Sequence, residues 1–185
     1  MNKVKLIETG FDDLFIIEVQ KFGDARGYFS ETYNYRDLKS VGVGIRFVQD
    51  NQSKSSRGVV RGLHFQNAPH AQTKLVRVLT GKILDVVVDL RKDKKTFGKS
   101  FQLEMSSDTG QQILVPKGFA HGFIVMSDSA ELLYKTDEFH SLESEGGILF
   151  NDPALNIDWR VPVSEMIISD KDKKHPKLAD AKFNF

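Results

Sequence analysis

Residues 110–121 have the sequence GQQILVPKGFAH, from which the fold class can be predicted. Its apolar run Gln112–Val115 is β-prone and lies between the turn residues Gly110 and Pro116–Gly118, and a second β-prone run follows at residues 121–126. Short strands separated by glycine-marked turns are typical of sandwiches and barrels. The stretch therefore predicts two consecutive strands of an all-β domain.

The same alternation of β-prone runs and turns extends along the chain. Further runs lie at residues 14–19, 27–33, 46–51, 58–66, 74–80, 82–90, 100–105 and 132–136. Helix is expected only at residues 35–41, with a turn or two within 169–179. No repeat or long linker divides the sequence. We expect one all-β domain over residues 1–185, with a few short helices.

Composition excludes several classes of protein. Hydrophobic residues make up 40% and charged residues 28% of the 185 residues, which is a globular and not a disordered composition. The net charge of +1 argues against sequence-independent binding to nucleic acid. Cysteine is absent, which removes disulfides and thiolate chemistry. Residues 1–6 lack a secretory signal and no run approaches the roughly 20 apolar residues of a membrane span, so we expect a cytoplasmic protein.

Alternation in residues 74–80 places Lys74, Val76 and Val78 on one face of a strand and Leu75 on the other. Both faces are largely apolar. One face is therefore predicted to line a barrel interior, and the other to contact a second layer or a second subunit. Lys74 would enter a barrel lined by valines, unless its ammonium reaches the surface along its apolar stem.

His64 and Tyr134 each lie inside an apolar, strand-forming stretch. An imidazole that accepts a proton near neutral pH and a phenol that donates one form an acid/base couple, and on opposite sides of a sugar ring this couple would invert a carbon centre. The structural alternatives are a histidine hydrogen-bonded within a sheet and a core tyrosine. Strict alternation separates Arg61 from His64, so both reach one pocket only if Gly62 forms a bulge.

Gly110, Pro116, Gly118 and His121 follow the spacing of the second motif of the cupins, although Val125 replaces the asparagine that usually closes it. This resemblance implies a double-stranded β-helix, or jelly roll. Where cupins carry a metal-binding glutamate, this chain has Lys74, and Ala68 replaces the first motif histidine, while His70 keeps the second. An ammonium repels a cation and two histidines are too few ligands, so we expect no metal. His70 and His175 are expected at the surface.

Seven further stretches occur together in a fixed order. They are residues 24–32 (DARGYFSET), 47–51 (FVQDN), 58–66 (GVVRGLHFQ), 74–78 (KLVRV), 116–123 (PKGFAHGF), 151–153 (NDP) and 157–159 (IDW). With them, the chain resembles the dTDP-4-dehydrorhamnose 3,5-epimerase family from about Leu6 to Asp172. The resemblance implies a cofactor-free jelly-roll homodimer whose substrate is a dTDP-4-keto-6-deoxy-hexose, in dTDP-rhamnose biosynthesis.

Site residues follow from the same resemblance. It implies that His64 is the base, Tyr134 the acid and Asp172 the partner of the histidine. It implies substrate contacts in the pocket at Arg61, Lys74 and His121. It also implies contacts with the nucleotide at Gln49 and Asn51. An N-terminal segment is implied to reach the neighbouring subunit's site through Arg26, Phe29 and Glu31. Without the resemblance, other roles are open for two of these residues. Asp172 lies in a mixed-charge run typical of a solvated tail, and His121 could have a structural role as a hydrogen-bond partner of Asp85.

One departure from the family lies close to the site. Many members carry two adjacent tyrosines where this chain has Phe139 and His140, and at least one of these positions is expected to face the sugar. Epimerisation at C3 and C5 through an enolate is the leading hypothesis. The alternatives are a 3-epimerase or ketoisomerase of a related sugar nucleotide, a non-catalytic nucleotide-sugar-binding cupin, and a metal-dependent cupin oxygenase, against which Lys74 argues.

Overall fold

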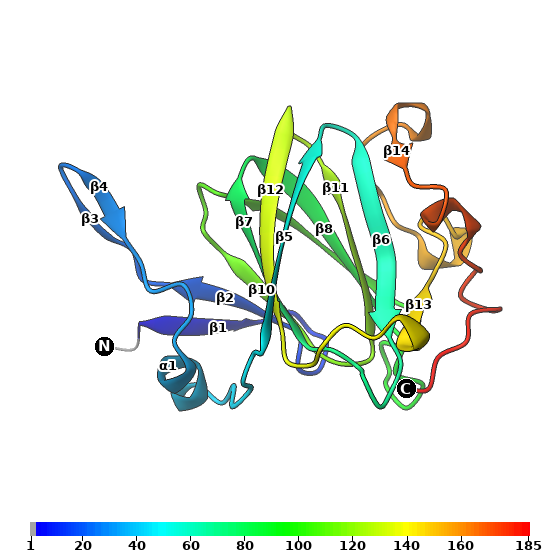
Figure 1. Cartoon of the computed structure of the whole chain (residues 1–185), viewed down its shortest axis with the longest axis horizontal. Coiled ribbons are helices and arrows are strands. Elements are labelled where there is room, and N and C mark those ends of the chain that lie inside the picture. Colours follow the sequence, from blue (N-terminus) through cyan, green and yellow to red (C-terminus); the bar gives the residue numbers. More distant parts are fainter. Residues whose placement is uncertain (1–2) are drawn as a thin grey trace.

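The computed structural model describes residues 3–185, which form two antiparallel sheets packed face to face (Figure 1). The first sheet has the order β1 (Val4–Glu8), β2 (Phe15–Val19), β10 (Gln112–Val115), β7 (Lys74–Thr80), β12 (Ser129–Thr136) and β5 (Gln49–Ser56). The second has the order β13 (Glu145–Gly147), β6 (Val59–Gln66), β11 (Phe119–Val125), β8 (Lys82–Asp89) and β9 (Ser100–Ser106), and β14 (Ile167–Ile168) pairs with β6 in parallel. The predicted all-β jelly roll is confirmed.

Helices are few and short, as expected. The α-helix α1 spans Tyr35–Ser40, and Asn34 caps its N-terminus by accepting a hydrogen bond from the Arg36 N–H. The remaining helical turns are 3₁₀ helices at η1 (Leu142–Ser144), η2 (Pro153–Leu155), η3 (Val163–Glu165) and η4 (Asp172–Lys174). None of the helices within residues 3–185 is long and apolar enough to cross a membrane.

Two predicted strands were placed wrongly. The strand expected at residues 46–51 is β5, which begins at Gln49 and extends to Ser56, because the polar segment after Asn51 pairs along β12 in full register. The run at residues 27–33 forms only the short β4 (Gly27–Phe29), which pairs with β3 (Phe22–Asp24) in a separate hairpin. Long-range pairing, and not local propensity, sets both boundaries.

Both faces of β7 are covered, as its apolar pattern predicted. Val76 and Val78 belong to the core between the sheets, together with residues such as Val87 and Leu132. Leu75 packs on the opposite face in a second cluster that includes Leu38 of α1. Lys74 shares the face of Val76, so its side chain enters the space between the sheets.

Gly62 forms the predicted bulge in β6. His121 pairs with His64 in the register of β11 and β6, but Phe123 pairs with Arg61, so β6 has one extra residue. Gly62 has a φ of 124°, and a Cβ there would lie 2.5 Å from the Cα of Gly122. The bulge brings Arg61 and His64 to one cavity, which strict alternation would have prevented.

Candidate active site

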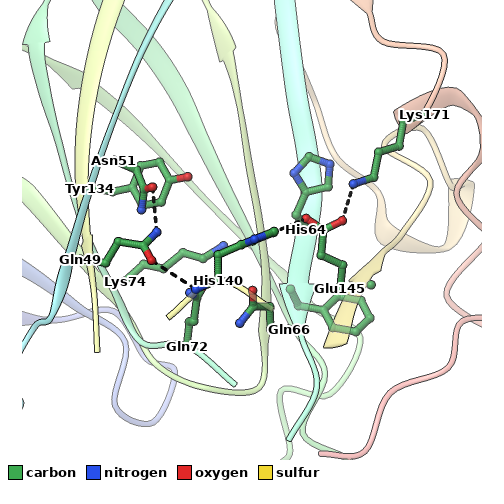
Figure 2. A pocket seen from close by; sticks show the side chains of 12 residues that line it. Gln49, Asn51, His64, Gln66, Gln72, Lys74, Tyr134, His140, Glu145 and Lys171 are labelled. Atoms are coloured by element: carbon green, nitrogen blue, oxygen red, sulfur yellow. Dashed lines mark hydrogen bonds and ion pairs between the residues drawn. The ribbon is translucent and has the colours of Figure 1, made fainter. Parts of the chain in front are cut away.

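A cavity between the two sheets has two adjoining compartments of about 160 Å³ and 530 Å³. His64, Lys74, Tyr134 and Lys171 line both of them. Figure 2 shows the smaller compartment, with Tyr134 on one side and His64 of β6 on the other. Strands from both sheets therefore supply the walls, and a volume of this order suits a small polar ligand.

His64 is anchored from behind by Asp172. Its Nε2 lies 2.8 Å from Asp172 Oδ1, and the His64 side chain remains 39% exposed while that of Asp172 is 5% exposed. The other Asp172 oxygen accepts a hydrogen bond from the Gly62 N–H at 3.2 Å. The bulge at Gly62 thus also holds the carboxylate, and Asp172 is not part of a solvated tail.

The Asp172 carboxylate is ionised at neutral pH. Burial alone would raise the pKa of Asp172, but the hydrogen bonds from His64, Gly62 and Ser169 together lower it to about 2. An ionised carboxylate only accepts hydrogen bonds, so the bonded Nε2 of His64 carries the proton. In the neutral imidazole, Nδ1 of His64 then has the free lone pair that a general base requires.

Tyr134 stands on the opposite side of the cavity from His64. It shares a face of β12 with Leu132, as predicted, and both line the larger compartment. Burial raises the pKa of the Tyr134 phenol, while the positive charge of Arg61 opposes that rise. Tyr134 is therefore a protonated phenol at neutral pH and can donate its proton into the cavity.

Lys74 and His121 line the larger compartment, and Asp85 is buried next to His121. His121 Nε2 lies 2.8 Å from Asp85 Oδ2, which is the contact that the structural alternative for His121 predicted. Burial lowers the pKa of Lys74 to about 8, and the negative charge of Asp85 limits the fall. Asp85 Oδ1 is buried without a hydrogen-bond partner among residues 3–185. Lys74 thus remains a cation near neutral pH inside a mostly apolar barrel.

The smaller compartment carries most of the remaining predicted contacts. Gln49 Nε2 donates to Asn51 Oδ1 at 2.9 Å, and Gln49 Oε1 accepts from the His140 N–H at 3.2 Å (Figure 2). His140 Nε2 lies 2.7 Å from Glu145 Oε1, and Lys171 Nζ donates to the other oxygen of Glu145. His140 therefore faces this compartment, in a network that leads to the residue preceding Asp172.

Four predicted site residues do not line this cavity. Arg26 and Phe29 lie on the β3–β4 hairpin, which projects from the sandwich at the upper left of Figure 1. Arg26 pairs with Asp24, and Phe29 is 65% exposed. Glu31 pairs with Lys3 outside the cavity. Phe139 is 62% exposed, and only its carbonyl, which accepts from Gln66 Nε2 at 3.2 Å, is tied to the site.

Sequence reasoning missed several residues of the site. Asp85 was named only as a bonding partner, although a carboxylate inside the apolar run of β8 signals a buried network. Glu145 and Lys171 gave no signal, because their pairing depends on the path of the chain after β13. The expectation for His175 was wrong: its side chain is 13% exposed and lies against Asp172. His70 is exposed, as expected.

The arrangement is suited to moving a proton across a bound ring. A base on one wall, an undissociated phenol on the other and a cation between them can remove a hydrogen next to a carbonyl, hold the negative oxygen that results, and return a proton from the opposite face. The cupin metal position is filled by Lys74, whose ammonium repels a divalent cation. The Lys74 position therefore does not fit a metal ion.

Comparisons with known proteins agree with this geometry. A model of the dTDP-4-dehydrorhamnose 3,5-epimerase family matches residues 8–180. The chain is 46% identical over 181 residues to dTDP-4-dehydrorhamnose 3,5-epimerase of Shigella flexneri, which covers 97% of this chain and 99% of the relative.

Solved structures give the same result. A crystal structure of dTDP-4-dehydrorhamnose 3,5-epimerase from Elizabethkingia anophelis superposes with a TM-score of 0.92 at 49% identity, over 96% of this chain and 98% of that one. A dTDP-6-deoxy-D-glucose-3,5-epimerase from Legionella pneumophila, in complex with dTDP-4-keto-L-rhamnose, gives a TM-score of 0.91 at 41% identity, over 96% and 94%.

Proposed function

The chain belongs to the dTDP-4-dehydrorhamnose 3,5-epimerase family, and we propose that it epimerises dTDP-4-dehydro-6-deoxy-glucose at C3 and C5 in dTDP-rhamnose biosynthesis. The relatives that it matches are epimerases, so the chain is an isomerase. The observation that supports the residue roles best is the placement of His64, backed by Asp172, and Tyr134 on opposite sides of one cavity.

The proposed chemistry is removal and return of a proton next to the 4-keto group. His64 Nδ1 takes the hydrogen from the carbon as a proton, and the electron pair of the broken C–H bond moves into an enolate whose charge lies on the keto oxygen. Tyr134 then donates its hydroxyl proton to the other face of the carbon. The carbon is thereby inverted, and solvent restores the proton of Tyr134 and removes that of His64.

Lys74 is proposed to stabilise the enolate. Its ammonium enters the cavity from β7 and shares the cavity lining with His64 and Tyr134. A cation in a buried site stabilises a developing oxyanion far better than it would in water. The negative charge of Asp85, which is hydrogen-bonded to His121, helps to keep Lys74 charged. This role needs no metal ion and no organic cofactor.

The diphosphate and nucleotide are proposed to bind at Arg61, Gln49 and Asn51. Arg61 lines the larger compartment and carries a guanidinium, which can bind phosphate oxygens bidentately. Gln49 and Asn51 present amide groups in the smaller compartment. Amide groups of this kind suit a nucleobase or a sugar hydroxyl.

A homodimer is proposed to complete the site. The β3–β4 hairpin exposes Tyr28 (63%) and Phe29 (65%), together with Arg26, and none of these residues lines the cavity of its own chain. Apolar rings on a projecting hairpin suit contact with a second copy of the chain. There Arg26 could reach the partner's diphosphate. We further propose that residues 1–185 act as a single domain in the cytoplasm.

A second candidate is a 3-epimerase or ketoisomerase of a related sugar. His140 faces the cavity where many members carry a tyrosine, which changes the groups next to the substrate. Incubation of the enzyme with dTDP-4-keto-6-deoxyglucose in D₂O, followed by NMR, separates these functions. Deuterium at both C3 and C5 with inverted product is expected. Exchange at a single position would reject double epimerisation, and an absence of any exchange would reject the epimerase.

A further inference from the structure

A second histidine lies behind the proposed base. The His175 ring packs over Gly147 of β13, where an added Cβ would come within 2.4 Å of the ring, so only glycine leaves room for it. Gly147 is also the register partner of His64. The two imidazole rings stand edge to face with centroids 5.5 Å apart. The sheet is thus shaped to hold a second imidazole beside His64.

The two histidines share one carboxylate oxygen. His64 Nε2 lies 2.8 Å and His175 Nε2 lies 3.6 Å from Asp172 Oδ1. One ligand atom from each of the three residues falls within 4.8 Å of the other two. Two imidazole nitrogens and a carboxylate oxygen are a ligand set that zinc accepts in tetrahedral sites, with bonds of about 2.0 to 2.2 Å and water as the fourth ligand.

The Nε2 atom of His175 is not engaged elsewhere within residues 3–185. Its Nε2 is buried and forms no hydrogen bond with residues 3–185, since 3.6 Å to Asp172 exceeds hydrogen-bond range. A nitrogen that is buried without a hydrogen-bond partner among residues 3–185 is free to bind a metal ion, and the Lys171 charge is offset by its pairing with Glu145.

We propose that His64, Asp172 and His175 bind one zinc ion, and that this ion inhibits the enzyme. The site is separate from the cupin metal position, which Lys74 fills. The Gly62 N–H, which donates to the free oxygen of Asp172, orients the carboxylate from outside the site. The site opens to the larger compartment at His64 and Asp172, which both line it.

Inhibition follows from the tautomer of His64. A neutral imidazole that binds a metal through Nε2 carries its only hydrogen on Nδ1. The Nδ1 lone pair, which is proposed to take the substrate proton, is then lost. Binding of zinc at Nε2 also replaces the hydrogen bond between His64 and Asp172. The proposed inhibition rests on the proposed function, whereas the proposed zinc binding rests only on the three side chains.

The test combines zinc binding with activity in metal-free protein prepared by dialysis against a chelator. Zinc is supplied from a chelator buffer that fixes its free concentration, because the substrate diphosphate also binds zinc. Calorimetry measures binding, and the deuterium-exchange assay measures activity. We expect one zinc ion per chain, and we expect activity to fall over the same range of free zinc.

Three variants make the test specific. His175→Phe keeps a ring over Gly147 but removes the ligand, and His175→Asn serves if the larger ring disturbs folding. We expect either to weaken zinc binding, and inhibition measured relative to the variant's own zinc-free activity, by at least about tenfold. His70→Ala, which removes an exposed histidine elsewhere, should match the wild type.

The outcomes separate the two proposals. Absence of stoichiometric binding by the wild type, or equal binding by the wild type and both His175 variants, would overturn the zinc site. Binding without loss of activity would overturn inhibition. If the zinc-free protein binds zinc through His175 but exchanges no deuterium, the proposed function fails while the zinc site stands.

Discussion

Asp172 Oδ1 accepts a hydrogen bond from His64 Nε2 at 2.8 Å, although the two residues are 108 positions apart in the chain. The contact exists because β14 pairs with β6 and η4 follows directly, which returns the C-terminal segment to the strand that carries His64. The carboxylate is buried while the imidazole is open to the cavity. Asp172 therefore holds the His64 ring in place and leaves the ring open to the cavity.

Replacement of Asp172 by Asn should impair the chemical step more than binding. An amide can donate as well as accept a hydrogen bond, so the tautomer with a free Nδ1 on His64 is no longer enforced. We expect kcat to fall about 10²-fold or more, with little change in KM, because a positioned base contributes on this scale. Steady-state kinetics measures the split. A variant with normal kcat and raised KM would show that Asp172 acts in binding instead.

The same carboxylate should make stability depend on pH in the acid range. The pKa of Asp172 is lowered from 3.8 to about 2 in the folded protein. A carboxyl group whose pKa is lowered by folding stabilises the folded protein at pH values above its unfolded-state pKa. This contribution is lost as the pH falls through its folded-state pKa. We expect a loss of about 2 kcal/mol between pH ~4 and ~2, since one unit is worth about 1.4 kcal/mol. Urea unfolding at each pH measures it, and Asp172→Asn should show a shallower slope over this interval.

Lys74 should set the alkaline limit of activity. Its pKa is lowered to about 8, so the ammonium predominates below that pH and is lost above it. If the cation stabilises the enolate, kcat/KM falls as pH rises through about 8, because kcat/KM reports the free enzyme. Lys74→Met should lower kcat about 10²- to 10³-fold at neutral pH and remove this limb. An unchanged alkaline limb in Lys74→Met would assign it to another group.

Much of this site could be predicted because it follows from local sequence patterns. Alternation placed Lys74 inside the barrel, and the conflict between Arg61 and His64 required the bulge that Gly62 supplies. His175 and Glu145 could not be predicted, because only the folded chain brings Gly147 against His175 and Lys171 against Glu145. The boundaries of β5 were missed for the same reason, since pairing with β12 decides them.

The β3–β4 hairpin should be needed for assembly. Tyr28 and Phe29 are largely exposed in the single chain, so their replacement by serine should leave its fold intact. If they pack on a second copy, the double variant Tyr28→Ser, Phe29→Ser should shift the protein toward monomer and reduce activity. Light scattering coupled to size exclusion measures the mass. A matched control is Val163→Ser, which replaces an apolar residue that is 60% exposed outside this hairpin.

Tyr134→Phe should separate proton removal from inversion. His64 still takes the proton, exchanges it with D₂O and returns deuterium to the same face, whereas the opposite face has lost its donor. We expect inversion to fall about 10²- to 10⁴-fold, while deuterium incorporation with retained configuration falls much less. NMR of the recovered sugar measures both. His64→Asn should lose exchange and inversion together, because no base remains to form the enolate.

Tyr35→Phe provides the control for loss of a hydroxyl, since Tyr35 lies on α1 and does not line the cavity. It should exchange and invert like the wild type. The ratio of exchange to inversion is the informative quantity, because misfolding lowers both rates equally and leaves the ratio unchanged. A ratio that stays at the wild-type value in Tyr134→Phe would mean that another group donates the second proton, and the phenol would lose its proposed role.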